Sequence, residues 1–165
     1  MNIRRLLKHL FTTDGRVRRA FPPASLAAIE QAIQASEADH LGEIRFVAEA
    51  ALDGAPLIRN QSARQRAIDV FSELRVWDTE HNNGLLIYLL LADHAVEIVA
   101  DRGLHAKVGA PEWGRICRAM EAAFREGKFT DGVLDGVQAV TLHLVAHFPA
   151  AGANPNELPD RPVLR

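Results

Sequence analysis

A chain of 165 residues with 48% hydrophobic and 24% charged residues has the composition of one ordinary globular domain. Its single cysteine excludes an intramolecular disulfide framework and fits a reducing compartment, so we expect a cytoplasmic location. The charge is unevenly distributed, because residues 1–20 hold six Lys or Arg against one Asp, a balance of +5. The remaining residues hold 13 basic and 20 acidic side chains, a balance of −7. A basic arm on an acidic body is not the pattern of a nucleic-acid-binding domain, whose basic face would lie on the body.

The first predicted element is a short basic amphipathic helix in the N-terminal arm, residues 1–21. Apolar residues recur in it at helical spacing, with basic residues between them: Ile3, Leu6, Leu7, Leu10 and Phe11 are interspersed with Arg4, Arg5, Lys8 and His9. Lys8 and His9 interrupt the apolar run and no small-residue cleavage site follows, so the arm is not a signal peptide. Two interpretations stay open: residues 1–20 attach to an anionic membrane surface, or the apolar stripe docks on the protein's own sheet.

The next segment predicts a helix and then a strand. Pro22-Pro23 interrupts the chain, and the helix that follows is expected to run to about residue 38. In residues 43–50 apolar side chains alternate with charged ones, which predicts a strand with one polar face.

A second helix and a second strand complete a βαβ unit. Ser62 and Gln65 form a capping box, which begins a helix that is expected to end near Trp77. Four apolar side chains of this helix are expected to be buried: Ala67, Ile68, Phe71 and Leu74. Residues 85–92 are eight apolar residues in a row, which predicts a strand buried on both faces. The order strand, helix, strand predicts that the two strands are parallel.

The second half of the chain predicts a hairpin, two helices and a tail. After a corner at Asp93-His94, residues 95–100 return as the second strand of a β-hairpin. Pro111 begins a helix, and Thr130 is expected to cap the last one. Residues 149–165 contain four prolines and are expected to form an extended tail with no core to bury. Residues 22–148 therefore predict one α/β domain with a small mixed sheet, a βαβ unit plus a β-hairpin.

No residue pattern predicts a catalytic or a cofactor-binding site. Cys117 lies on the apolar stripe of its helix, between Trp113 and Met120, and is expected to be a core cysteine. His143 and His147 have the spacing of helical metal ligands, but no third ligand accompanies them, so we expect a surface or capping role. No glycine-rich phosphate-binding loop follows a strand.

Three carboxylates are the candidate metal ligands. The parallel strands 43–50 and 85–92 end at the same edge of the sheet, which places Asp53 and Asp93 there. The helix 112–126 is expected to return to that edge, so the following turn delivers Asp131. Oxygen ligands on loops suit a hard cation, Ca²⁺ or Mg²⁺. The alternative is that these carboxylates are separate, solvated surface charges.

Several segments resemble the TPM domain family, which is named for a thylakoid luminal protein, a photosystem II repair protein and a worm acetylcholine-receptor auxiliary protein. The matching segments are GEIRFVAE at 42–49, the helix ending in Trp77, NNGLLIYLLLAD at 82–93 and the turn from Phe124 through Gly127-Lys128-Phe129 to Gly132. The resemblance covers about residues 24–148. It implies a three-layer α/β/α sandwich with a Rossmann-like order over residues 22–148, the divalent-cation binding of some members, and the weak acid phosphatase activity of a plant member.

The sequence departs from the family pattern at two places. Members tend to carry Ile-Glu-x-Gly-x-Gly-Leu-Glu after the hairpin, and Val99 and His105 stand here at the two Glu positions. The turn that often reads Gly-Asp-Tyr is Gly127-Lys128-Phe129, which places an ammonium where a carboxylate is expected. A cation site at this turn therefore depends on Asp131 or Glu126 to compensate.

These observations predict a non-catalytic interaction or adaptor module with an unknown protein partner, acting near the inner membrane surface and responsive to divalent cations. Many bacterial members of the family are tethered by an apolar segment, and in this chain the basic arm is the only substitute. The alternative function is a metal-dependent acid phosphatase of low turnover that uses the carboxylates at the sheet edge. A third interpretation is a purely structural module whose arm packs on the fold.

Overall fold

The computed structural model describes residues 3–152 and 154–165, so residues 1 and 2 of the predicted arm and residue 153 of the predicted tail lie outside the described residues. Its elements in chain order are α1 (Ile3–Phe11), α2 (Asp14–Ala20), α3 (Pro23–Glu37), β1 (Glu43–Glu49), α4 (Gly54–Ile58), α5 (Ala63–Glu73), β2 (Gly84–Leu90), the 3-10 turn η1 (Leu91–Asp93), β3 (Ala95–Ala100), α6 (Arg102–Val108), α7 (Ala110–Arg125), α8 (Phe129–His147) and β4 (Val163–Leu164).

The four strands form one mixed sheet in the order β3-β2-β1-β4. β1 and β2 are parallel and in register from Glu43 opposite Gly84 to Glu49 opposite Leu90. β2 and β3 are antiparallel and are joined by η1 and by His94, whose positive φ of 53° closes the corner. The parallel pair and the hairpin predicted from the apolar runs are both confirmed.

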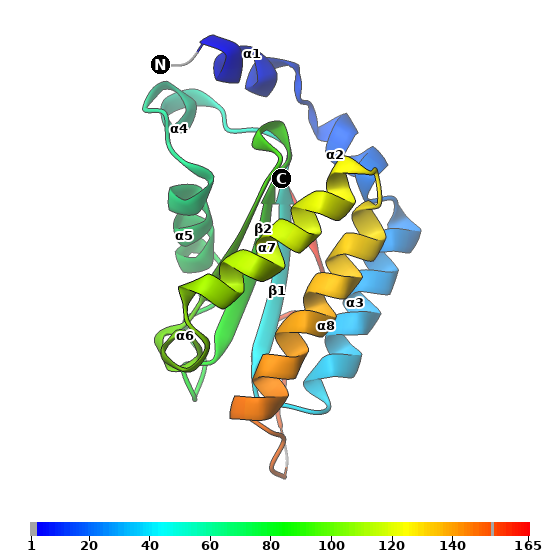
Figure 1. Cartoon of the computed structure of the whole chain (residues 1–165), viewed down its shortest axis with the longest axis vertical. Coiled ribbons are helices and arrows are strands. Elements are labelled where there is room, and N and C mark those ends of the chain that lie inside the picture. Colours follow the sequence, from blue (N-terminus) through cyan, green and yellow to red (C-terminus); the bar gives the residue numbers. More distant parts are fainter. Residues whose placement is uncertain (1–2, 153) are drawn as a thin grey trace.

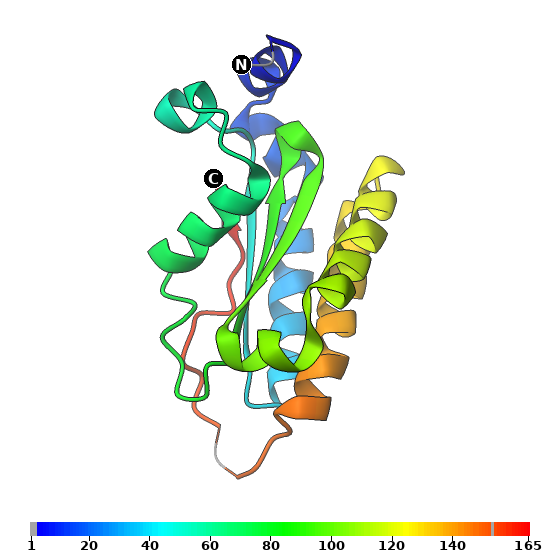
Figure 2. The ribbon, with the colours of Figure 1, turned by 60° about the vertical axis from the view of Figure 1, so that its left-hand side comes forward.

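Helices cover both faces of the sheet (Figures 1 and 2). α3, α7 and α8 lie against one face, and α5 lies against the other, together with the segment that leads into β4. Each face has its own apolar core, and the two cores are separated by the strands themselves. The predicted three-layer α/β/α sandwich is therefore confirmed.

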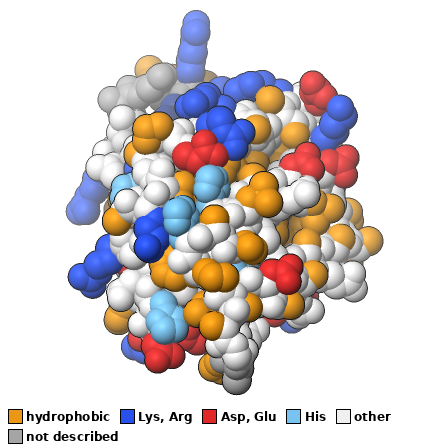
Figure 3. All heavy atoms as spheres, turned by 60° about the horizontal axis from the view of Figure 1, so that its bottom comes forward, with side chains coloured by type: hydrophobic (Ala, Val, Ile, Leu, Met, Phe, Trp, Pro, Cys, Tyr) orange, Lys and Arg blue, Asp and Glu red, His pale blue; other side chains and the backbone are white. Residues whose placement is uncertain are grey.

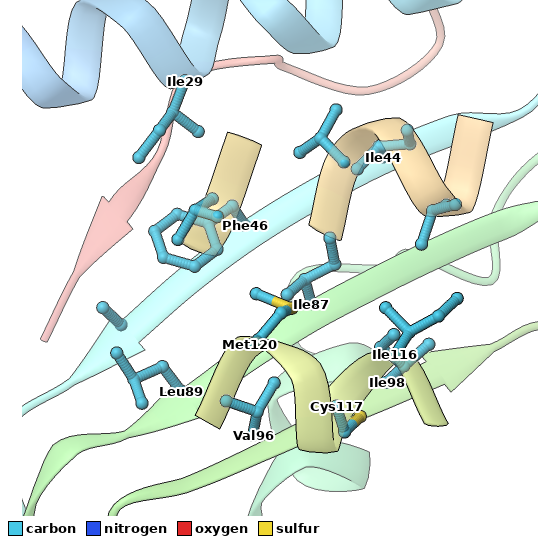
Figure 4. Close-up of a cluster of buried hydrophobic side chains, with 14 of the residues drawn as sticks. Ile29, Ile44, Phe46, Ile87, Leu89, Val96, Ile98, Ile116, Cys117 and Met120 are labelled. Carbon is cyan, nitrogen blue, oxygen red and sulfur yellow. The ribbon is translucent and has the colours of Figure 1, made fainter. Parts of the chain in front are cut away.

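β2 is the centre of the core, as its unbroken apolar sequence predicted. Leu85, Ile87 and Leu89 belong to the core beneath the three large helices, and the intervening Leu86, Tyr88 and Leu90 belong to the core beneath α5. Figure 4 shows the first of these cores, with side chains of β2 packed between those of the neighbouring strands and of α7. All of β2 is buried, and its residues 85–90 are at most 1% exposed, as expected for a strand that is covered on both sides.

The contacts of Asn83 and Gly84 explain the Asn-Asn-Gly sequence at the start of β2. Only glycine fits at position 84, because a Cβ there would collide with the backbone carbonyl of Val76. Asn83 is fully buried, and its side-chain amide donates to the carbonyl oxygen of Leu41 at 2.8 Å. This bond joins the starts of β1 and β2 and holds the parallel pair in register.

β1 has the predicted polar face, but the expectation that this face is exposed to solvent is wrong, because all seven residues of the strand are buried. Its three charged side chains lie under α5 and the C-terminal segment, where each has a local partner or neighbour. Glu49 accepts hydrogen bonds from Tyr88 and Arg66, and Arg45 donates to the carbonyl oxygen of Arg161. The alternation of side-chain types was real, but the polar side faces other parts of the chain and not water.

The C-terminal segment also differs from the expectation that residues 149–165 have no core to bury. It is extended, but Val163 and Leu164 form β4 beside β1, and Leu158 is buried beneath the sheet. The backbone N–H groups of Glu157 and Leu158 donate to the carboxyl group of Glu43 at 3.2 and 3.1 Å. These backbone contacts attach the tail to the domain in spite of its prolines.

Helix boundaries follow the sequence signals with two exceptions. The capping box at Ser62 is present, but α5 ends at Glu73, because Arg75 adopts a left-handed conformation and turns the chain back. Ile68 lies on the outer side of α5 and is 45% exposed, contrary to prediction. Thr130 does not cap α8, which begins one residue before it; its hydroxyl instead donates to Ser25 on α3 at 2.7 Å.

Among the described residues, no helix has both the length and the apolar character needed to cross a bilayer.

Candidate functional site at the carboxyl edge of the sheet

The carboxyl ends of β1 and β2 lie at one end of the molecule, where the N-terminal arm also lies (Figure 1). α1 rests against η1, the turn that follows β2. The turn between α7 and α8 reaches the same end, since Gly127 and Phe129 share a cavity there with His94. The sequence predicted that these loops converge, and the structure confirms that convergence.

Asp93, the last residue of η1, is the centre of a hydrogen-bonded cluster with α1. The guanidinium of Arg5 approaches its carboxylate side-on, with Nη2 at 2.7 Å from Oδ2 and Nε at 3.1 Å from Oδ1. The imidazole Nε2 of His9 lies 3.0 Å from Oδ1. Both carboxylate oxygens therefore already accept hydrogen bonds from groups of the same chain, in a geometry typical of strong charge-assisted pairs.

Arg5 extends the cluster to the loop between α4 and α5. Its Nη2 also donates to the backbone carbonyl of Gln61 at 2.6 Å, and its Nη1 donates to Oδ1 of Asn60 at 2.9 Å. Asn60 itself has a left-handed backbone, with a φ of 54°. The guanidinium of Arg5 thus joins α1, η1 and the loop between α4 and α5. These bonds use several N–H donors fixed in one plane, which a lysine ammonium does not provide.

His9 is the most deeply buried residue of α1, at 3% exposed, and its tautomer follows from its partners. The backbone N–H of Leu52 donates to Nδ1 at 2.8 Å, so Nδ1 must carry a lone pair. The ring proton of the neutral imidazole is then on Nε2, where it is donated to Asp93. A proton on Nδ1 would be incompatible with the hydrogen bond from Leu52.

The electrostatics of Asp93 agree with this geometry. Burial by itself would raise the pKa of this carboxyl, but the hydrogen bonds from Arg5 and His9 and the charge of Arg5 outweigh it and hold the pKa below its ordinary value. Asp93 is therefore an ionised group whose charge is compensated by Arg5. Such a carboxylate serves first as the anchor of α1.

The three predicted metal ligands do not share one cluster. Asp53 is exposed at the start of α4, Asp131 is exposed in the first turn of α8, and Asp93 holds α1. In the part of the chain that the structure describes, no three His, Cys, Asp or Glu side chains come together in a way that could hold a metal ion. Binding of Ca²⁺ or Mg²⁺ by Asp53, Asp93 and Asp131 stays a prediction.

α1 docks in a manner that neither interpretation of the sequence anticipated. The helix is attached to the domain, but through its polar side, by Arg5 and His9. Its apolar stripe points outward: Ile3, Leu10 and Phe11 are each 69% exposed, and Leu7 is 47% exposed. The hypothesis that this stripe docks on the sheet is therefore wrong.

Arg5 and His9 were missed as site residues by sequence reasoning. They are four positions apart, and therefore lie on one side of the helix, away from the apolar stripe. That pairing of a basic residue and a histidine was visible in the sequence. Their acceptor was not, because Asp93 is 84 positions from His9 and no periodic pattern connects them.

Cys117 is the core cysteine that was expected, and of the two histidines of α8, His147 is exposed and His143 contacts α7. Cys117 is buried beneath α7, and burial raises the pKa of its thiol to about 12, so it stays protonated and is a poor nucleophile. His143 lies 2.9 Å from a carboxylate oxygen of Glu112 and packs edge-on against Trp113. These contacts join α8 to α7.

Comparison with known proteins places the chain in a family. A model of the TPM domain matches residues 18–142, which is most of the chain. The chain belongs to the TPM domain family. A search of curated proteins finds no match.

Two bacterial proteins of known structure resemble this TPM domain. The BA42 protein of the psychrophilic bacterium Bizionia argentinensis is 29% identical, with a TM-score of 0.73, and the match covers 86% of this chain and 93% of that one. The N-terminal domain of a protein from P. gingivalis is 21% identical, with a TM-score of 0.61, and the match covers 78% of this chain and 81% of that one. The second likeness shows the fold alone.

The structure also places the lysine that distinguishes this TPM domain from the family pattern. Lys128 is exposed in the turn before α8, and its ammonium is 2.7 Å from a carboxylate oxygen of Glu126. Glu126 is thereby paired with Lys128. This ion pair competes with the use of Glu126 as a cation ligand, which the sequence suggested as compensation for the lysine. Any cation at this edge would have to compete with Lys128 and, at Asp93, with Arg5.

The cation prediction can be tested by removing that competition. We expect Ca²⁺ to raise the melting temperature of Arg5→Gln more than that of the wild type, because the substitution frees the oxygens of Asp93. Ca²⁺ at ten times its Kd would add roughly 1.4 kcal/mol of stability, or about 3–6 °C. Thermal unfolding with and without millimolar Ca²⁺ measures the shift.

Arg59→Gln is the matched control, since Arg59 is an exposed arginine of the neighbouring loop and loses the same charge. It should respond to Ca²⁺ as the wild type does, and the double variant Arg5→Gln with Asp93→Asn should lose the added response. Equal Ca²⁺ shifts in all four proteins would favour separate, solvated carboxylates.

Proposed function

We propose that this TPM domain is a non-catalytic interaction module that attaches reversibly to an anionic membrane surface through α1. The observation that carries the proposal is the orientation of α1, which is held on the domain by its polar side and presents its apolar stripe to solvent. An isolated exposed apolar residue needs no explanation, but four on one side of one helix form an attachment surface.

The helical geometry supports this orientation. Successive residues are about 100° apart around a helix, so Ile3, Leu7 and Leu10 share one side, and Arg5 and His9 share a second side roughly opposite to it. His9 is buried at the sheet edge, and the exposed stripe therefore points away from the domain. A flat bilayer surface could contact the stripe without displacing any part of the fold.

The charges around the stripe favour an anionic surface as the partner. Arg4 and Lys8 are exposed on α1, and three more exposed arginines lie on α2: Arg16, Arg18 and Arg19. In the space-filling view, Lys and Arg side chains gather along the upper rim, at the end where α1 and α2 lie (Figure 3). Each basic residue near an anionic bilayer contributes about 1 kcal/mol, and the shallow insertion of one short helix makes such binding reversible and sensitive to salt.

The proposal predicts that Leu10→Ser with Phe11→Ser weakens vesicle binding by roughly tenfold or more. Full burial of a side chain of this size is worth about 1.5–3 kcal/mol, and 1.4 kcal/mol corresponds to a factor of ten. Co-sedimentation with vesicles of phosphatidylglycerol and phosphatidylcholine measures the partition coefficient, which should be high for the anionic vesicles, low for neutral ones and reduced by added salt.

The matched control is Leu142→Ser with Val145→Ser, which removes two apolar side chains that are 68% and 38% exposed on α8. It should bind vesicles as the wild type does. Loss of binding in the control to the same extent, or no binding of the wild type to anionic vesicles, would contradict the proposal. The stripe would then be a surface for the unknown protein partner.

A further inference from the structure

A cavity of about 490 Å³ lies beside α1, between α2, η1 and the turn from α7 to α8. We call it the basic cavity, because its polar wall is formed mainly by Arg16, Arg19 and His94. Leu91 and Phe129 provide an apolar wall, and Thr12 joins the cavity to the end of α1. The α1 stripe ends at Phe11, directly before this residue.

The charge of the basic cavity is not neutralised by the protein. No carboxylate lines it, and the side chains of Arg16, Arg19 and His94 have no hydrogen-bond or ion-pair partner among residues 3–152 and 154–165. Asp93, the acid next to His94 in sequence, is already occupied by Arg5 and His9, and Asp14, two positions before Arg16, does not line the cavity. Two guanidiniums that face one cavity without an acid repel each other, and an anion between them would remove that repulsion.

We propose that the basic cavity binds a phosphate monoester. A monoester carries a charge of about −1.5 to −2 at neutral pH and has three strong acceptor oxygens. Two arginine forks match that charge, and each can donate two parallel hydrogen bonds to phosphate oxygens. His94 adds a third donor at the rim. A phosphodiester carries one charge and two terminal oxygens, so it fits this set of donors less well.

The monoester belongs to a lipid headgroup, and this choice of source rests on the proposed function at the membrane. The cavity is larger than a phosphate group and has an apolar wall, which leaves room for the adjoining glycerol of a lipid. It also lies next to the helix that we place on the bilayer. A membrane-bound α1 would therefore bring the basic cavity to the depth of the headgroups.

The first experiment tests the cavity without a membrane. Titration of ¹⁵N-labelled protein with sn-glycerol 3-phosphate, and with inorganic phosphate, should give saturable shifts at η1, α2 and the turn before α8. Arg16→Gln with Arg19→Gln should weaken this binding at least tenfold. The control, Arg18→Gln with Arg59→Gln, removes two exposed arginines that do not line the cavity and should retain it.

The second experiment identifies the source of the phosphate. Vesicles of phosphatidic acid and of phosphatidylglycerol, matched in surface charge, compare a monoester with a diester headgroup. The wild type and the control should prefer phosphatidic acid, whereas Arg16→Gln with Arg19→Gln should bind both kinds equally and weakly. Preference for free glycerol phosphate without any vesicle binding would assign the site to a soluble phosphate and would overturn only the lipid source.

The two proposals can fail separately. The variant Leu10→Ser with Phe11→Ser should lose vesicle binding and still bind glycerol phosphate, because the stripe is not part of the cavity. Absence of saturable binding of glycerol phosphate to the wild type would overturn the phosphate site, even if vesicles still bind. Equal losses of glycerol phosphate binding in the cavity variant and the control would show attraction to overall charge alone. That result would also overturn the phosphate site.

Discussion

Leu89→Ala is expected to lower the free energy of unfolding by about 2–5 kcal/mol, the usual range for a truncated core leucine. Leu89 is 1% exposed in β2, and it is paired with Ala48 of β1 and Val96 of β3 in the middle of the sheet. Its side chain packs in the core beneath α3, α7 and α8 (Figure 4). Because β1 and β3 hold β2 on both sides, the backbone has little freedom to move into the cavity that the truncation would leave. Urea denaturation followed by circular dichroism measures the change.

Leu142→Ala is the matched control for that experiment, because it makes the same truncation at a residue that is 68% exposed on α8. Its effect should stay within about 0.5 kcal/mol. If the two variants unfold at the same urea concentration, β2 is not the centre of the core, and the position of the site at its carboxyl end loses its support.

Glu49→Gln is expected to cost about 3–5 kcal/mol, because it removes one member of a buried charged pair. Glu49 is 8% exposed and accepts hydrogen bonds from Nε of Arg66 at 2.9 Å and from the hydroxyl of Tyr88 at 2.6 Å. Burial raises the pKa of Tyr88, so its hydroxyl stays a neutral donor. A neutral amide would leave Glu73, a largely exposed carboxylate 2.9 Å from Nη1, as the remaining ion-pair partner of Arg66 among the described residues.

A double-mutant cycle with Tyr88→Phe separates the hydroxyl from the ion pair. Tyr88→Phe alone should cost about 0.5–1.5 kcal/mol, and it should cost less once Glu49 is Gln, since the two groups share one bond. Glu126→Gln is the control for charge, because its pair with Lys128 is exposed to solvent and should contribute little to stability. Strict additivity in the cycle, or equal losses for Glu49→Gln and Glu126→Gln, would contradict a buried network.

The elements that sequence reasoning predicted well are those encoded locally. The eight apolar residues before Asp93 predict a strand that is buried on both faces, and β2 is buried on both faces in the structure. The corner at Asp93-His94 and the capping box at Ser62 likewise depend on neighbours within a few positions. Each of these signals is complete within a short stretch of chain.

The features that were missed depend on partners far along the chain. Glu43 and Glu49 were assigned to a solvent-exposed face, because the sequence shows the type of a side chain and not the group that it contacts. Their partners are backbone N–H groups of Glu157 and Leu158 and the side chains of Arg66 and Tyr88. β4 was missed for the same reason, since two residues after several prolines carry no periodic signal.

The candidate site was predicted in position and not in chemistry. Parallel strands place Asp93 at the carboxyl edge on topology alone, and the structure confirms that placement. The carboxylate was expected to face a cation from solution, and it faces Arg5 and His9 of its own chain. Periodicity reported the apolar stripe of α1 correctly, but it could not show which side of the helix would meet the sheet.

The position of β4 bears on the order in which this molecule folds. β4 completes the sheet from a segment far from its partner strand; Arg45 and Arg161, which connect the two, are 116 positions apart. Closing so long a loop is entropically costly, so this pairing is expected after the hairpin and the local helices have formed. Until then β1 has an unpaired edge, which can accept a strand from any chain that carries the right sequence. Two molecules that fold side by side could therefore exchange their C-terminal strands, and dilution during refolding would decide between the closed monomer and the exchanged pair.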